Sequence, residues 1–352
     1  MHKPLPAVVA LLALTFCTLA SAAETGFSFN DHPGKYLDVL LDGKLVARYM
    51  DAYDTSSPER RDETYKTYLT IFDADGKQPI TNTYNPKGEY PHHRGIFIGF
   101  RKITFNGKEY DRWHMHDSNG PVDPKTKKKG ATRGEIVHLK FENQKADADS
   151  ATFTSVLAWN DEAGKPFLTE ERTMTFHRAP APARIVIDFT SKLTPKGDCT
   201  LDGDPEHAGV QYRPTNDIDK SKTSYVFPVE HPSPHKDLDY PWVGETYTLQ
   251  SGKTYSVVEM SHPDDPKGTK WSAYRDYGRF GAFVPHEIKS GESLTLKYRF
   301  LIADGEMPPA DVIEKSFNQF TGESNSTPQI TVMPAEKSAP AKPKAVKAPE
   351  AK

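Results

Sequence analysis

The chain has 352 residues, of which 45 are lysine or arginine and 48 are aspartate or glutamate, so its formal net charge is −3. A charge this close to neutral, without a stripe of basic residues, argues against nucleic acid as a partner. Beyond the first 23 residues, no stretch approaches the roughly 20 apolar residues of a membrane-spanning helix, which argues against stable membrane insertion.

The N-terminal segment has the pattern of a secretory signal peptide. Lys3 precedes an apolar run over about residues 7–19, and small residues follow at 20–23. A short apolar run with a small-residue cleavage site is typical of an export signal rather than of a spanning helix. We therefore expect residues 1–23 to be removed and the mature protein to be periplasmic or extracellular.

The two cysteines give no disulfide framework. Cys17 lies within the expected signal peptide, and the bulky Phe16 before it does not fit a lipoprotein signal, although lipidation stays open. Cys199 is then the single cysteine of the mature chain and has no intramolecular partner. Such a thiol is more often a small buried filler than a nucleophile.

Alternating apolar residues predict β-strands along most of the chain. Turn pairs at Asp42-Gly43 and Asn106-Gly107 predict two hairpins, the second joining 95–105 to 108–116. The other predicted strands lie at 67–72, 134–143, 151–159, 171–177, 183–193 and 294–303.

Helical spacing of apolar residues occurs near the end of the fold, at 309–320. The pattern predicts an all-β fold: one antiparallel two-sheet sandwich over residues 24–322, with one short C-terminal helix. Residues 323–352 are rich in proline, alanine and lysine towards their end, and we expect them to form a disordered tail.

The first polar cluster flanks the second predicted hairpin. His92, His93 and Arg94 precede it, and pairing across its turn would bring Trp113, His114 and His116 back beside them. Imidazoles transfer protons near neutral pH, a guanidinium holds carboxylates or hydroxyl pairs, and an indole stacks on a sugar ring.

Two other interpretations of this cluster stay open. A divalent metal is possible at His92, His93, His114 and His116, because several imidazoles with a nearby aspartate make a site of nitrogen and oxygen ligands. Alternatively, the histidines only hydrogen-bond the loop backbone. No other cofactor is predicted.

Two further polar segments follow along the chain. In 202–214, a carboxylate beside an imidazole has the composition of a general acid and base pair, and in 262–287 aromatic residues alternate with arginine as they do in sugar clefts. The candidate residues in these segments are Glu206, His207, Gln211, Arg213, Trp271 and Arg275.

The motifs resemble those of exported bacterial proteins called PmoA, also described as a domain of unknown function. The shared pattern consists of "PHHRG", "EHAGVQYR", "HPDDP" and "IKSGESLTLKYRFLIADG", and it spans about residues 28–320. The methane oxygenase activity in that name is not expected, because the subunit so named spans membranes repeatedly. The last motif also resembles the final strands of galactose mutarotase-like sandwiches, which favours that supersandwich fold and a carbohydrate ligand.

Two functions are compatible with these observations. In the first, the chain is an exported lyase, hydrolase or epimerase acting on a carbohydrate or another small polar substrate. His92, His93 or His114 exchanges a proton, Glu206 or His207 supplies its partner, and arginines hold the substrate: Arg94, Arg213 and Arg275. In the second, the sandwich is structural or binds sugar without catalysis, through Trp113 or Trp271.

Overall fold

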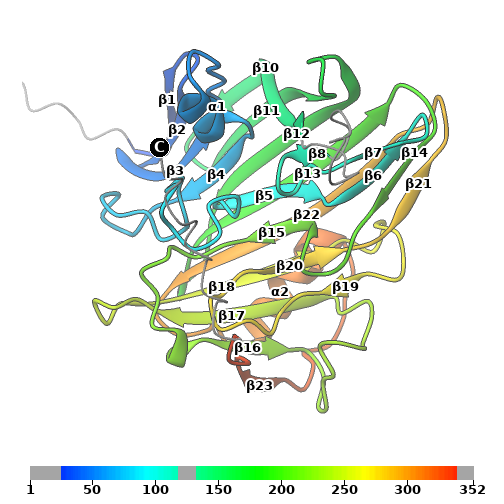
Figure 1. Ribbon diagram of the computed structural model, residues 1–352. Coiled ribbons are helices and arrows are strands. Elements are labelled where there is room, and N and C mark those ends of the chain that lie inside the picture. Colours follow the sequence, from blue (N-terminus) through cyan, green and yellow to red (C-terminus); the bar gives the residue numbers. More distant parts are fainter. Residues whose placement is uncertain (1–24, 118–131, 339–352) are drawn as a thin grey trace, which may run out of the picture.

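Two antiparallel sheets pack face to face, and a helix lies on the outer side of the larger sheet (Figure 1). The computed structural model describes residues 25–117 and 132–338, without the side chains of residues 116, 117, 132 and 133. The predicted all-β sandwich with one short C-terminal helix is confirmed by this arrangement. Within the described ranges, no helix has the length and apolar character needed to cross a membrane.

The smaller sheet has eight strands, and its middle strands carry the segments that form the candidate site. In spatial order the strands are β1 (Phe27–His32), β2 (Tyr36–Leu41), β3 (Lys44–Met50), β4 (Tyr68–Ile71), β5 (Ile96–Phe100), β15 (Ala208–Tyr212), β20 (Phe280–Phe283) and β19 (Lys270–Trp271). The predicted turn between β2 and β3 is confirmed, because Asp42 and Gly43 both have positive φ.

The larger sheet has nine strands. In spatial order they are β10 (Glu135–Ala146), β11 (Ser150–Asn160), β12 (Pro166–Arg178), β13 (Ala183–Pro195), β22 (Leu294–Asp304), β18 (Thr254–Ser261), β17 (Trp242–Thr248), β16 (Ser224–Phe227) and β23 (Thr331–Pro334). The strands predicted at 134–143, 151–159, 171–177, 183–193 and 294–303 all lie within it.

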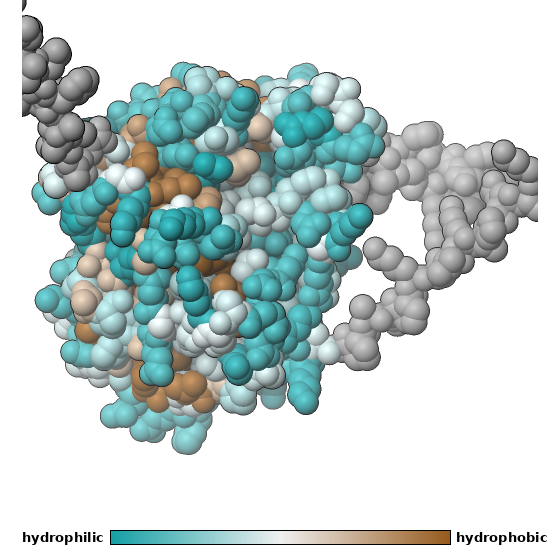
Figure 2. All heavy atoms as spheres, turned by 90° about the vertical axis from the view of Figure 1, so that its left-hand side faces the viewer, coloured by the Kyte–Doolittle hydropathy of each residue, from teal (hydrophilic) through white to brown (hydrophobic). Residues whose placement is uncertain are grey.

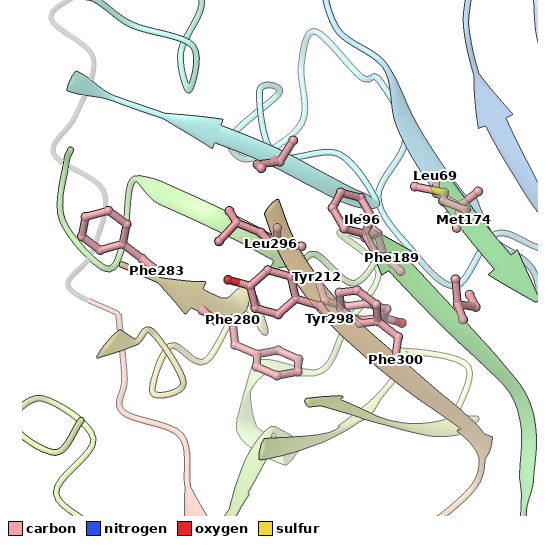
Figure 3. Packing of buried hydrophobic residues seen from close by; sticks show 14 of the residues in the cluster. Leu69, Ile96, Met174, Phe189, Tyr212, Phe280, Phe283, Leu296, Tyr298 and Phe300 are labelled. Carbon is pink, nitrogen blue, oxygen red and sulfur yellow. The ribbon is translucent and has the colours of Figure 1, made fainter. Parts of the chain in front are cut away.

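The hydrophobic core fills the space between the two sheets. Figure 3 shows Leu69, Ile96 and Tyr212 of the smaller sheet facing Phe189 and Phe300 of the larger one. Each of these side chains is at most 1% exposed. The core therefore holds the two sheets, and the site on the smaller one, in fixed register.

Alternation along one strand explains how the larger sheet is covered on both faces. On β13, Ile185 and Ile187 point into the main core, whereas Val186 packs against α2 (Ala310–Thr321) with Ile313 and Phe317. Successive residues of a strand face opposite sides, so a continuously apolar strand has a partner on each side. The outer surface is mostly hydrophilic on the side shown in Figure 2.

A third sheet has four strands: β21 (His286–Ile288), β14 (Cys199–Asp202), β6 (Lys102–Phe105) and β7 (Lys108–Tyr110). Burial raises the pKa of the Cys199 thiol to about 12, so this side chain stays protonated. The expectation of a buried filler agrees with this environment. The remaining elements are α1 (Pro58–Thr64), which the sequence reasoning missed, β8 (His116–Asp117), β9 (Thr132–Arg133) and a 3₁₀ helix at Lys220–Lys222.

The second predicted hairpin is only partly correct. Asn106 and Gly107 do form the turn, with φ of 49° and 72°, but the turn joins the short strands β6 and β7. β5 instead pairs with β4 and β15 in the smaller sheet. Residues 111–115 form no strand, because the Asp111 carboxylate accepts hydrogen bonds from the backbone N–H groups of Trp113 and His114 and holds a turn.

The predicted tail boundary at residue 322 is wrong. β23 pairs with β16 over four residues, and Glu336 donates its backbone N–H to the carbonyl of Tyr274. Ser338 then hydrogen-bonds the Asp276 carboxylate. The chain thus remains part of the fold to residue 338, and 339–352 lie outside the described residues.

Candidate functional site

Four histidines from three separate segments form one group of rings, named here the imidazole cluster: His92, His93, His114 and His207. The ring centroids of His92 and His93 are 4.3 Å apart, those of His92 and His114 4.7 Å, and those of His114 and His207 5.4 Å. The first two predicted polar segments therefore converge, because His114 contacts both His92 and His207.

Two glycines bring these segments together. Gly95 follows His93 and Arg94 with φ of 52°, and a Cβ at this position would lie 2.0 Å from the carbonyl oxygen of Leu69. Gly209 follows His207 with φ of 88°, and a Cβ there would lie 1.9 Å from the carbonyl oxygen of Ala282. Only glycine allows both the backbone conformation and this close approach of neighbouring strands.

An aspartate three residues earlier orients each of the two outer imidazoles. Nδ1 of His114 donates to Asp111 over 2.8 Å, and Nδ1 of His207 donates to Asp204 over 2.8 Å. The histidine side chains are 30% and 32% exposed. Because Nδ1 is used in each ring, Nε2 is the nitrogen available to a ligand.

Burial keeps the inner part of the cluster neutral. It lowers the pKa of His92 to about 2, with a further contribution from the Lys66 charge, and it lowers the pKa of His93 well below its usual range. Burial also lowers the pKa of His207, against the opposing effect of the Asp204 carboxylate. At neutral pH these three rings each offer one donor and one acceptor.

His93 lies deepest in the cluster. It is 3% exposed, and neither ring nitrogen has a hydrogen-bond partner among the described residues. Its ring stacks on Tyr90 at 5.1 Å and meets Trp113 edge-on at 5.4 Å. The Tyr90 ring is 38% exposed, so it covers His93 on the solvent side.

A carboxylate next to the cluster is fixed by the third polar segment. Oε1 of Glu206 accepts hydrogen bonds from the Arg275 guanidinium and, over 3.0 Å, from the Tyr274 hydroxyl. The Glu206 and Arg275 side chains are 25% and 29% exposed. The third polar segment thus contacts the loop that carries His207, through the Arg275 and Glu206 pair.

Arg94 does not have the free guanidinium that substrate binding needs. It is fully buried and donates to the backbone carbonyls of Pro91, Glu63 and Asp62 over 3.0, 2.7 and 2.6 Å. Its side chain therefore fixes the loop before β5 and helix α1. The expected direct grip on a substrate is not supported.

Four more predicted binding residues are enclosed in the same way. Arg213 donates to the Tyr277 carbonyl and to Asn216, and Trp271 donates to the Tyr240 carbonyl. The enclosed residues, each at most 1% exposed, are Trp113, Gln211, Arg213 and Trp271. A buried ring cannot present its face to a sugar, so the expected stacking on either tryptophan does not fit the structure.

The predicted metal site gains no support from the described residues. Within them, no group of three or more His, Cys, Asp or Glu side chains is arranged to hold a metal ion. The side chain of His116, one of the four expected ligands, lies outside the description.

The sequence reasoning missed the residues that orient the histidines. Asp111 and Asp204 both occur three positions before a site histidine, in "DRWH" and "DPEH". A shared D-x-x-H spacing was therefore the signal that could have found them. Tyr274 carried no such signal, because its contact with Glu206 spans 68 residues of sequence.

A family model matches residues 36–318, and its description is a family of unknown function, DUF6807. The chain belongs to this family. Since the family has no assigned function, membership in DUF6807 supplies no activity. No curated protein matches the chain.

Solved structures give distant similarities to this DUF6807 chain. A mutant heparan sulfate lyase from Pedobacter heparinus is 9% identical with a TM-score of 0.38, over 78% of this chain and 36% of the lyase. An α-galactosidase from Geobacillus stearothermophilus is 10% identical with a TM-score of 0.38, over 85% of this chain and 42% of the galactosidase. A GalM/aldose epimerase homologue from C. elegans is 10% identical with a TM-score of 0.30, over 81% of this chain and 100% of the homologue. The chain thus spans about a third of the lyase.

Proposed function

We propose that this DUF6807 protein is an exported carbohydrate-active enzyme in which His114 and His207 exchange protons with the substrate. The observation that carries the proposal is the pair of partly exposed rings, 5.4 Å apart, each with Nδ1 fixed by an aspartate. General acid and base catalysis needs such oriented imidazoles with one nitrogen directed to the ligand. The proposed export rests on the N-terminal sequence.

The chemistry assigns one proton movement to each ring. Burial keeps His207 neutral at pH 7, so its Nε2 can accept a proton from a substrate hydroxyl or C–H group. His114 is oriented by its hydrogen bond to Asp111, and its Nε2 is the nitrogen assigned to deliver a proton to the opposite position. Lyase, hydrolase and epimerase reactions all need one such removal and one such delivery.

The surroundings favour a sugar over an apolar substrate. His114, His207, Glu206 and Arg275 are all partly exposed, and Tyr90, which stacks on His93 of the imidazole cluster, is 38% exposed. Polar groups combined with an aromatic face suit a ligand with hydroxyls on its edge and C–H groups on its faces.

Sugar binding without turnover is the second candidate, and the exposed Tyr90 ring favours it. In that case Tyr90→Ala would abolish binding, and loss of the histidines would leave it intact.

The test uses the mature chain, residues 24–352, with a panel of glycans. New reducing ends, unsaturated products and exchange of anomers report hydrolase, lyase and epimerase activity. We expect His207→Gln to lower turnover roughly 100-fold or more. His177→Gln is the matched control, because His177 also contacts an aspartate, Asp188, over 3.2 Å but lies on β12. Absence of turnover on the whole panel, or equal rates in both variants, would sink the proposal.

A further inference from the structure

A hollow of about 220 Å³ opens beside the imidazole cluster, with His92 and His114 on one wall. Tyr65, Tyr84, Asp62 and Arg94 also line it. His207 and Glu206 are not among its lining residues. A ligand seated in it would therefore present its edge to His114.

The size of the hollow limits what it can hold. Pockets for drug-sized ligands have volumes of roughly 300–1,000 Å³. A hollow of about 220 Å³ is smaller than this range. One sugar ring is thus a more suitable occupant than two linked rings, and a longer glycan would extend beyond the hollow.

The charged groups of the hollow do not favour an anion. Arg94 is fully buried and donates hydrogen bonds to three backbone carbonyls. His92 is neutral, and any charge on His114 is offset by its partner Asp111. The other charged lining residue, Asp62, is an acid. A uronate or sulfate group here would lose water without gaining a free cation, which is costly.

Arg94 gives the hollow a rigid aromatic wall. Its guanidinium carbon lies 4.3 Å from the ring centre of Tyr65 and 4.6 Å from that of Tyr84. Tyr65 is 9% exposed, whereas Tyr84 is only half-buried. Tyr84 is therefore held in place and still has ring surface for the C–H face of a sugar.

We propose that this hollow binds a single uncharged sugar ring, so that the substrate is a neutral monosaccharide or the end of a neutral glycan. The inference rests on the proposed function for the reaction, but binding in the hollow is measured separately. It assigns Tyr84 as a binding residue and Arg94 as the residue that positions it.

The test is calorimetric titration of the mature chain with glucose, galactose and xylose, and with glucuronate, galacturonate and glucose 6-sulfate. We expect saturable binding of at least one neutral sugar, and affinity for its acidic counterpart that is lower by roughly tenfold. Tyr84→Ala should weaken neutral-sugar binding roughly tenfold, and Tyr84→Phe, which keeps the ring, should retain affinity within about twofold. Tyr36→Ala is the matched control, because Arg48 likewise lies over the Tyr36 ring, at 3.8 Å.

The inference is overturned if no neutral monosaccharide binds, if the acidic sugars bind more tightly, or if Tyr84→Ala leaves affinity unchanged. Its failure is distinguishable from failure of the proposed function. Turnover of glycans without monosaccharide binding contradicts only the inference, whereas monosaccharide binding without turnover on any glycan contradicts only the proposed reaction. His207→Gln should keep affinity for the monosaccharide, because His207 does not line the hollow.

Discussion

Asp204 holds Nδ1 of His207, and its Oδ1 also accepts the backbone N–H of Glu206 over 3.0 Å. The same carboxylate therefore orients the imidazole and fixes the loop from which Glu206 extends. Burial lowers the pKa of His207, and the hydrogen bond and charge of Asp204 raise it. Without Asp204, the pKa of His207 would therefore be lower still. This residue sets both the geometry and the proton affinity of the proposed base.

Asp204→Asn tests that role. The amide has no charge and does not favour the Nδ1–H form, so we expect kcat to fall on the order of 100-fold or more. Because the lost carboxylate raised the pKa of His207, the acid limb of the kcat/KM against pH profile should move to lower pH. Asp188→Asn, at the His177 contact on another part of the sheet, is the control. An unmoved acid limb would show that His207 is not the titrating base.

At the residue scale, the sequence located the polar side chains better than it assigned their roles. His92, His93, His114 and His207 were predicted and do meet. Arg94 was expected to hold a substrate but is enclosed by three carbonyls. The difference arises because guanidinium burial depends on which backbone carbonyls lie nearby in the fold, and a local pattern does not contain that information.

At the element scale, the segment from β23 to Ser338 supports the site from outside the predicted domain. Glu336 bonds the Tyr274 carbonyl and the His235 ring over 2.7 and 2.8 Å, and Ser338 bonds Asp276 over 2.9 Å. Tyr274 and its neighbour Arg275 hold the Glu206 carboxylate. The C-terminal segment therefore positions the residues that fix Glu206.

Two shortened chains test this support. A chain ending at Gln329 lacks β23 and its contacts, whereas a chain ending at Ser338 keeps them. Both shortened chains lack residues 339–352. We expect the chain ending at Gln329 to melt roughly 5 °C lower and to have a raised KM, since the Arg275 and Glu206 pair loses its outer support. Equal KM values for the two chains, measured below either melting temperature, would exclude a positioning role.

Turn chemistry and strand order differ in how well the sequence predicts them. The Asp42-Gly43 and Asn106-Gly107 turns were correct because the required positive φ is a local property. The pairing partner of β5 was not predicted correctly, because β15 lies more than 100 residues later in the sequence and pairs with β5 only in the folded sheet. The predicted start of the tail was wrong for a similar reason, because β23 is a strand only through its pairing with the distant β16.

At the scale of the whole molecule, the candidate site lies over the face of the smaller sheet that points away from the main core. β5, β15 and β20 are neighbours (Figure 1) but run antiparallel, with Ile96 opposite Tyr212 and Phe100 opposite Ala208, so the segments before β5 and before β15 leave the sheet at opposite ends. They meet because Trp113 packs on Phe97 and contacts both His93 and His207. The larger sheet supplies the apolar face on which these strands pack (Figure 3). Alternation in the sequence predicts this sandwich, but the convergence of its loops depends on non-local pairing.

In the proposed reaction, His114 and His207 act together. The most direct measurement compares kcat of His114→Gln, His207→Gln and the double variant on the glycan that the mature chain converts fastest. If the two imidazoles form one acid and base pair, the double variant should lose no more than the more severe single variant, within roughly threefold. Single losses that multiply in the double variant, or single variants with wild-type kcat, would contradict the account.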